Sequence, residues 1–196
     1  MTLHEWRGTF NGTSYLISTN PALVSIDFVN DAFGSRDMYW ATALPLPALQ
    51  TMLRNSIVLG VYEIAQKFPD PRSVSEPSTP RTPSPTLDAA GVDSDSEELS
   101  MVGMARFATD FVLLMYLSDV YIQPEHRGKG VSTWLIECCK DLLDSMPHLR
   151  RLILFAAPGK SEHWYANMLD CYNVQRDSEH LACMTRFTGG TRNDDA

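Results

Sequence analysis

The chain has 196 residues, of which 44% are hydrophobic and 20% charged, as expected for one globular domain. Its net charge of −8 excludes nucleic-acid binding through a broad positively charged surface, and we expect no nucleic-acid partner. No stretch approaches the ~20 apolar residues of a membrane-spanning helix, so no membrane partner is expected. An N-terminus without a secretion signal and cysteines without metal-site spacing predict a cytoplasmic location, with the nucleus not excluded.

Residues 1–65 are predicted to form the N-terminal part of the domain. The Asn11-Gly12 pair between two alternating segments indicates a two-residue hairpin turn. Asn20 and Pro21 suit the start of a helix in which apolar residues recur at helical spacing. The expected elements are a hairpin over 5–19, helices over 21–33 and about 47–55, and a strand over 57–64.

Residues 66–100 differ sharply in composition from the flanking sequence. They contain six of the twelve prolines, seven serines, seven acidic residues and almost no large apolar side chains. Such a segment cannot bury enough apolar surface to offset its ordering entropy, which predicts a disordered insertion. Its Ser-Pro and Thr-Pro pairs could accept phosphate, although a solvated loop without regulation explains the composition equally well.

Residues 101–188 are predicted to complete the same domain, and 189–196 to form a flexible tail. An apolar run near 151–157 is typical of a buried parallel strand, whereas the other strands alternate. The fold class is therefore α+β with a mixed sheet. The expected elements are strands over 101–110, 113–122, 151–157, 172–175 and 180–187, and helices over 131–143 and 161–169.

The segment Arg127-Gly128-Lys129-Gly130 lies between a strand and an amphipathic helix. Glycines beside cations at a helix entrance form an anion site, because backbone N–H groups converge there and the helix dipole adds partial positive charge. This pattern predicts a ligand that carries a pyrophosphate.

Three other kinds of glycine loop share parts of this pattern. A dinucleotide fingerprint needs three glycines in the order GxGxxG, and only Gly128 and Gly130 fit it. A nucleotide-triphosphate loop needs Ser or Thr after Gly-Lys, whereas Lys129 is followed by Gly130, which excludes that class. A glycine turn that begins a helix without any ligand stays open.

The hexamer Arg127–Ser132 resembles the acetyl-CoA signature of the GNAT N-acetyltransferases, (Arg/Gln)-x-x-Gly-x-(Gly/Ala). Ser132 departs from it, since the family has Gly or Ala there. The strand lead-in DVYIQPEH and the later segment SEHWYANMLDCYNV are also similar to the family. The resemblance implies a GNAT fold with a mixed sheet of about seven strands and four helices. Its strands near 116–122 and 151–157 would splay apart around CoA.

The resemblance also implies acetyl-CoA as cosubstrate and a set of residues that bind it. The pantetheine arm would pair with open main-chain groups of a strand, and the pyrophosphate would lie on amides of the glycine loop. No metal is expected. The residues assigned to cofactor binding are Val120, Tyr121, Ile122, Arg127, Gly128, Lys129, Gly130, Val131 and Ser132.

The implied reaction is direct attack of a neutral amine on the thioester. Tyr165 matches the general acid of the family, which protonates the leaving thiolate. Asp119 is the first choice for the base, because a carboxylate in an apolar strand is costly to bury without a role. Asp110, Tyr116 and Tyr121 are alternatives. An amide near Val120 could stabilise the oxyanion, and His126 is expected to face solvent.

Acceptor selection in the family comes from the loop between the first two helices. Tyr39 and Trp40 occupy this loop, and Arg106 and Asp110 complete the predicted substrate-binding set. Packing of the first helices onto the sheet explains the two aromatic residues equally well. The favoured function is acetyl transfer to a small primary amine. A protein lysine or N-terminal acceptor, and a non-catalytic CoA-binding regulatory module, are the alternatives. The oligomeric state stays open, with a homodimer among the options.

Overall fold

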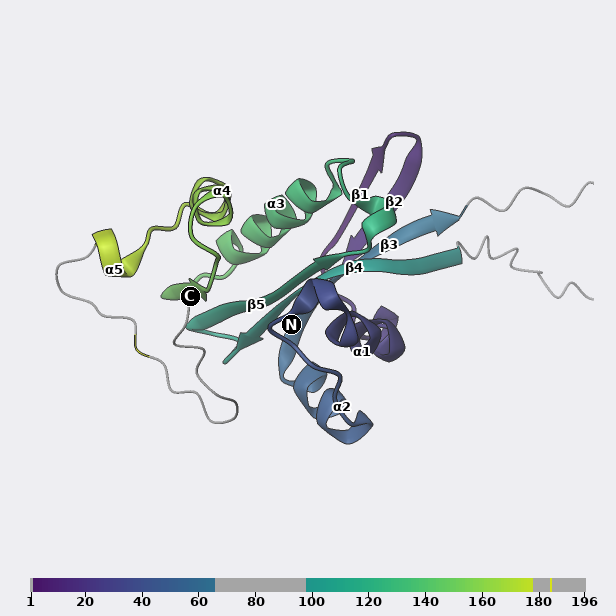
Figure 1. The fold of residues 1–196 in the computed structure, drawn as a ribbon, viewed down its shortest axis with the longest axis horizontal. Coiled ribbons are helices and arrows are strands. Elements are labelled where there is room, and N and C mark those ends of the chain that lie inside the picture. Colours follow the sequence, from purple (N-terminus) through teal and green to yellow (C-terminus); the bar gives the residue numbers. More distant parts are fainter. Residues whose placement is uncertain (1, 66–97, 178–183, 185–196) are drawn as a thin grey trace, which may run out of the picture.

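The computed structural model describes residues 2–65, 98–177 and 184 of the chain, and these residues form one central sheet flanked by helices (Figure 1). The strands are β1 (Glu5–Phe10), β2 (Thr13–Ser18), β3 (Ser56–Ala65), β4 (Glu98–Thr109), β5 (Leu114–Ile122) and β6 (Arg151–Leu154). The α-helices are α1 (Ile26–Gly34), α2 (Leu46–Arg54), α3 (Val131–Asp144), α4 (Lys160–Leu169) and α5 (Val174–Asp177). Short 3-10 helices are η1 (Pro21–Leu23), η2 (Arg36–Met38) and η3 (Pro124–His126).

The sheet has six strands in the order β1-β2-β3-β4-β5-β6. Neighbouring strands are antiparallel except β5 and β6, which are parallel. Helices α1 and α2 lie against one face and α3 against the other, with α4 packed beside α3 (Figure 1). The predicted α+β fold with a mixed sheet is confirmed.

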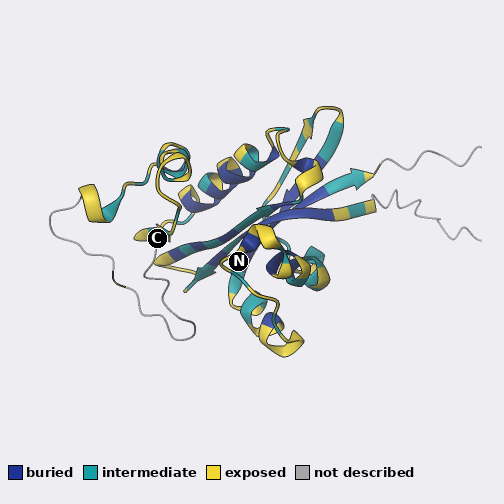
Figure 2. Ribbon diagram, in the orientation of Figure 1, coloured by how far each residue is buried: buried dark blue, intermediate teal, exposed yellow. Residues whose placement is uncertain are grey.

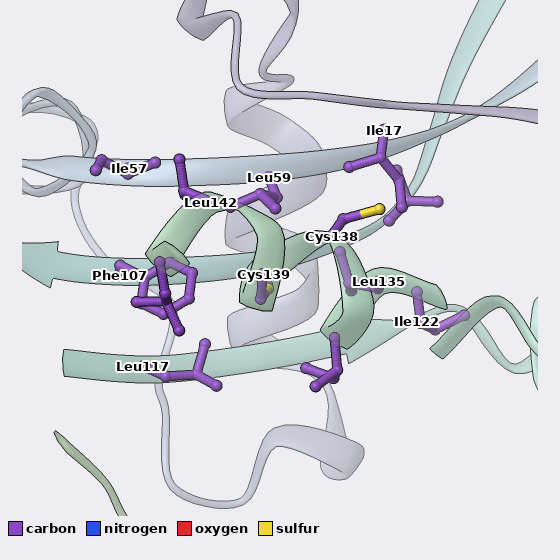
Figure 3. Packing of buried hydrophobic residues seen from close by; sticks show 14 of the residues in the cluster. Ile17, Ile57, Leu59, Phe107, Leu117, Ile122, Leu135, Cys138, Cys139 and Leu142 are labelled. Atoms are coloured by element: carbon purple, nitrogen blue, oxygen red, sulfur yellow. The ribbon is translucent and has the colours of Figure 1, made fainter. Parts of the chain in front are cut away.

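Each face of the sheet has its own hydrophobic core (Figure 2). One face of α3 packs against every second residue of the strands, because successive side chains of a strand point to opposite faces of the sheet (Figure 3). We call this the α3 core; it includes Ile17, Ile57, Leu59, Phe107, Leu117, Ile122, Leu135, Cys138, Cys139 and Leu142. The opposite α1 core includes Leu16, Val29, Phe33, Met38, Leu49, Val58, Tyr62 and Met104.

The N-terminal elements follow the predictions with one correction. The hairpin turn has φ of 49° at Asn11 and 79° at Gly12, as a two-residue turn requires. The predicted helix over 21–33 is divided into η1 and α1. Asn20 caps η1 by accepting a hydrogen bond from the Ala22 amide, and Ser25 caps α1 in the same way from the Phe28 amide. The second cap was not predicted.

The C-terminal elements depart further from the predictions. Strand β4 begins at Glu98, so residues 98–100 belong to a strand and not to the predicted insertion; residues 66–97 lie outside the described residues. The predicted strand over 172–175 is wrong, because Val174–Asp177 forms the short helix α5. The predicted strand over 180–187 and the tail over 189–196 also lie outside the described residues, apart from Met184. Within the described ranges the sheet therefore has six strands and not about seven.

Candidate active site

Strands β5 and β6 separate halfway along β5. Their pairing ends at Leu117 and Leu154, although β5 continues to Ile122. The register between β4 and β5 shifts at the same place, because Arg106 faces Asp119 while Phe107 faces Leu117. Ser118 is therefore the extra residue of a β-bulge, which bends and twists the strand locally. The predicted splay of these two strands is confirmed, and the bulge marks where it begins.

Beyond the bulge, one edge of β5 carries main-chain groups that β6 does not reach. The Gln123 amide donates to the Val102 carbonyl on the β4 side at 2.9 Å. Because antiparallel ladder groups alternate, the main-chain groups of Val120 and Ile122 point to the opposite side, where β6 has diverged. The Ile122 carbonyl there accepts a hydrogen bond of 2.7 Å from Arg127 Nε. The Val120 groups are thus placed to pair with an extended ligand.

The glycine loop, residues 127–130, leads directly into α3. Gly128 has φ of 71° and Gly130 has φ of 91°, values that L-residues with a side chain rarely adopt. Gly130 is the N-cap of α3, and no described side chain caps this end of the helix. The first-turn amides, which include those of Val131 and Ser132, consequently point out of the helix end toward the loop. A Cβ at Gly128 would meet no atom within 4 Å, so the loop surface there is open.

A buried contact holds the start of this loop. His126 was expected to face solvent, and this prediction is wrong: its exposed fraction is 9%. His126 Nδ1 lies 2.9 Å from the buried Tyr15 hydroxyl of β2. Burial raises the pKa of that Tyr15 phenol. The turn η3, which ends at His126, directs this side chain inward, which periodicity could not reveal because a short 3-10 turn has no repeat.

Arg127 joins the glycine loop to the segment between α1 and α2. Its guanidinium forms an ion pair of 2.6 Å with Asp37 of η2 and lies 5.6 Å from the centre of the Tyr121 ring. Sequence reasoning did not find this ion pair, since its two residues are 90 positions apart in the chain. It connects the predicted cofactor loop with the predicted acceptor loop, which we define as residues 36–40.

A buried polar network surrounds the bulge on the α1 face. Arg106 donates from Nε to Asp119 Oδ2 at 2.6 Å and from a terminal nitrogen to Ser56 at 2.9 Å. Ser118 donates to the same Asp119 oxygen at 2.6 Å. Because the bulge turns Ser118 and Asp119 to one side, a single guanidinium reaches both. Asp119 is 4% exposed, so this carboxylate is buried as a paired charge.

The acceptor loop is attached to the same network. Trp40 donates from Nε1 to Asp119 Oδ1 at 3.2 Å. The Tyr39 and Trp40 rings meet edge to face at 5.0 Å, and their exposed fractions are 82% and 49%. The structure therefore brings Trp40, Arg106 and Asp119 together, as expected of residues that share one site.

Asp110 lies apart from this group, in the turn between β4 and β5. Its Oδ1 accepts hydrogen bonds from the amides of Val112, Leu113 and Leu114 at 2.8–3.0 Å. These backbone hydrogen bonds lower the pKa of the Asp110 carboxyl. The geometry assigns Asp110 to turn formation, and its predicted contact with substrate remains a prediction.

Tyr165 lies on α4 and packs against the α3 core with its neighbour Trp164. Burial raises the pKa of the Tyr165 phenol to about 12. The phenol therefore keeps its proton throughout the neutral range, as a proton donor must. Helix α4 packs beside α3, so Tyr165 lies on the α3 side of the sheet.

Sequence reasoning missed Phe155 as a surface residue. Its ring meets the Tyr116 ring edge to face at 5.8 Å, and it is 63% exposed. The run 151–157 predicted a strand buried on both faces. In the structure β6 ends at Leu154 at the edge of the described sheet, and Ile153 and Phe155 are exposed. An apolar run alone does not show whether both faces are covered.

Two features are absent from the described part of the chain. No group of three or more His, Cys, Asp or Glu side chains there could hold a metal ion. No helix among these residues has the length and apolar character to span a bilayer.

Comparison with known proteins identifies the class of protein that this geometry represents. The acetyltransferase (GNAT) family model matches residues 60–168, which include part of β3, all of β5, the glycine loop and Tyr165. A Gibberella zeae protein named "Putative acetyltransferase FG08082" is 39% identical over 142 residues, 71% of this chain and 70% of that protein.

Solved structures share the fold at low sequence identity. One is a protein of Xanthomonas campestris pv. campestris described as belonging to the GNAT family (TM-score 0.54, 21% identity, 96% of this chain and 94% of that one). Another is described as a probable acetyltransferase (TM-score 0.50, 13% identity, 95% of this chain and 100% of that one). The chain belongs to the GNAT family of acetyltransferases.

Proposed function

We propose that this acetyltransferase uses acetyl-CoA to acetylate a primary amine on a small molecule. The observation that carries the proposal is the divergence of β5 and β6 beside the glycine loop. It combines an open strand edge, which suits an extended amide-containing chain, with a helix N-terminus, which suits a pyrophosphate.

The residues present fit acetyl-CoA, which supplies the acetyl group as a thioester. Val120 would offer its carbonyl to the pantetheine arm, and Ile122 would join it if Arg127 releases the Ile122 carbonyl. The amides of Val131 and Ser132 and the charge of Lys129 would hold the pyrophosphate. Ser132 would add a hydroxyl donor at the helix end, where the family has Gly or Ala.

The acceptor amine reaches the thioester from the α1 face. A C–N bond forms and the C–S bond breaks, so the nitrogen loses a proton and the sulfur gains one. An amine with a pKa of about 10 is mostly protonated at neutral pH and needs a base. Asp119 is proposed for this role. Arg106 and Ser118 occupy its Oδ2, so the proton would be accepted on Oδ1, to which Trp40 donates one hydrogen bond.

Tyr165 is proposed as the general acid that protonates the departing thiolate. Its raised pKa of about 12 keeps the phenol protonated at neutral pH. A thiol with a pKa of about 8.5 is the stronger acid, so the phenol would donate a hydrogen bond to the sulfur as the C–S bond breaks, and solvent would restore any proton that the phenol gives up. The Val120 amide, just beyond the bulge, is proposed to donate to the carbonyl oxygen as that oxygen gains charge.

Release of free CoA thiol tests the proposal. The protein is incubated with acetyl-CoA and a panel of small primary amines, with basic peptides as a second panel. Thiol release that depends on an amine supports the proposal, and product mass identifies the acylated nitrogen. Release only with peptides would point to a protein acceptor instead. Tight acetyl-CoA binding without release in either panel would contradict transfer.

A further inference from the structure

Aromatic rings collect on the α1 face of the sheet beside the divergence of β5 and β6. We define the aromatic surface as the exposed residues Tyr39, Trp40 and Phe155 together with the half-buried Tyr116. Two of these residues come from the acceptor loop, one from β5 and one from the segment after β6. Exposed aromatic side chains at one place are informative, because burial of such rings normally contributes to folding.

The strand geometry places these rings on one face. Leu117 and Leu154, the last paired residues of β5 and β6, pack against the α3 core. Side chains alternate along a strand, so Tyr116 points to the α1 face, and the ring of Phe155, just after β6, meets the Tyr116 ring. Burial, and to a smaller extent the charge of Asp119, raises the pKa of the Tyr116 phenol. Trp40 touches that same carboxylate.

Contacts at both ends of the acceptor loop hold it in place. Asp37 pairs with Arg127 of the glycine loop, and Trp40 donates to Asp119 of β5. The loop side of the aromatic surface is therefore positioned before any acceptor binds, which reduces the ordering cost of binding.

The charges around this surface do not suit a polycation. Asp37 and Asp119, the carboxylates that contact the loop and the bulge, are both paired with arginines. An acceptor that carried several ammonium groups would have to compete with Arg106 and Arg127 for them. A flat apolar group would instead bury surface against the rings without disturbing either ion pair.

We infer that the acceptor is an arylalkylamine, whose aromatic ring packs on Trp40 and Phe155 while its amine points toward the β-bulge. The inference rests on the proposed acetyl transfer to a small amine and narrows its substrate class. Trp40 and Phe155 are its specificity-determining residues, one from each side of the site.

The test compares kcat/KM for 2-phenylethylamine, n-butylamine and spermidine, measured by thiol release. We expect 2-phenylethylamine to exceed n-butylamine by at least about tenfold, given the energies of ring packing. Phe155→Leu and Trp40→Leu should each lower this ratio by about threefold or more. Phe155 is exposed, so its replacement should fold normally. Phe111→Leu, another exposed aromatic in the β4–β5 turn, is the matched control and should leave the ratio unchanged.

Failure of this inference is distinct from failure of acetyl transfer. Turnover in which n-butylamine or spermidine equals 2-phenylethylamine, or a ratio unaffected by Phe155→Leu, overturns the arylalkylamine assignment and leaves the transfer intact. If no amine is turned over, binding of 2-phenylethylamine to the CoA-saturated protein is measured by ligand-observed NMR. Binding that Phe155→Leu weakens supports the aromatic subsite without transfer, and absence of binding overturns it.

Discussion

The two halves of the active site are built in different ways. On the cofactor side, the groups that meet the ligand are main-chain amides of one short segment, which positive φ angles at Gly128 and Gly130 direct outward. On the acceptor side, they are side chains brought together from the loop before α2, two strands and a β-bulge. The cofactor side therefore depends on local conformation, and the acceptor side depends on tertiary contacts.

On the acceptor side, Asp119→Asn is expected to have the largest effect, a loss of folding stability. Loss of this carboxylate leaves the buried Arg106 without its counter-ion, since the Arg106 side chain is 12% exposed. We expect the free energy of unfolding to fall by about 3 kcal/mol in urea denaturation. The double variant Asp119→Asn with Arg106→Met removes both charges and should recover most of that loss.

The same double variant separates the two roles of Asp119. If Asp119 is the base, the stable double variant has a low kcat at neutral pH that recovers as the pH approaches the pKa of the acceptor amine. A kcat within about threefold of wild type would show that Asp119 only positions Trp40 and Arg106, and the base would lie elsewhere.

Tyr165→Phe is expected to lower kcat by about 100-fold, the low end for loss of a general acid. Its Kd for acetyl-CoA should change little, because the phenol is assigned to proton transfer and not to binding. Stopped-flow thiol release and titration calorimetry measure the two quantities. Tyr172→Phe, an exposed tyrosine just beyond α4, is the control.

The pH dependence of kcat/KM tests whether Tyr165 is the general acid. A phenol is competent to donate below its pKa and loses that ability as the pH rises through it, which for Tyr165 is about 12. We therefore expect wild-type kcat/KM to rise with pH as the amine is deprotonated, with no fall due to Tyr165 below a pH of about 11. An alkaline fall centred near pH 9 would argue against Tyr165 as the acid.

Gly130→Ala tests the dependence of the cofactor side on conformation. An alanine at φ of 91° costs about 1–2 kcal/mol and should turn the amides at the start of α3 away from the loop. We expect acetyl-CoA affinity to fall about tenfold, measured by calorimetry. Gly12→Ala carries the same conformational cost at φ of 79° in the β1–β2 turn and should leave that affinity unchanged.

The smallest effect concerns the α1 core, away from both halves of the site. The buried Tyr62 hydroxyl has no hydrogen-bond partner among the described residues, and burial raises the pKa of its phenol strongly. Tyr62→Phe removes an unsatisfied polar atom and should raise the free energy of unfolding by about 1 kcal/mol. A clear loss of stability would mean that this hydroxyl has a partner.

Much of the fold could be predicted from local signals. Asn11-Gly12 predicted the hairpin turn, and apolar spacing predicted α3 to within one residue of its end at Asp144. The errors occurred where tertiary context decides. Residues 172–175 have strand-like composition, yet Val174–Asp177 is helical, with Arg176 paired to Glu162 of α4. Ser25 begins a separate α1 because its side chain caps the Phe28 amide.

Sequence alone predicted the parts of the site that come from one short segment of the chain. The glycine loop could be found because its conformation restricts which residues it can contain. The pair Asp37–Arg127 could not be inferred, since nothing in a single sequence specifies partners so far apart. The pair Arg106–Asp119 could not be inferred because the β-bulge sets the register between β4 and β5. The isolated carboxylate of Asp119 in an apolar strand did indicate that a partner must exist.

Amine-dependent release of CoA thiol is the most direct test of the central claim, that the divergence beside the glycine loop positions acetyl-CoA for attack by an amine. The account predicts that thiol release requires both acetyl-CoA and a primary amine, and that Gly130→Ala and Tyr165→Phe reduce it through binding and turnover respectively. Thermal unfolding unchanged by saturating acetyl-CoA, together with no thiol release above the protein-free rate, would contradict it.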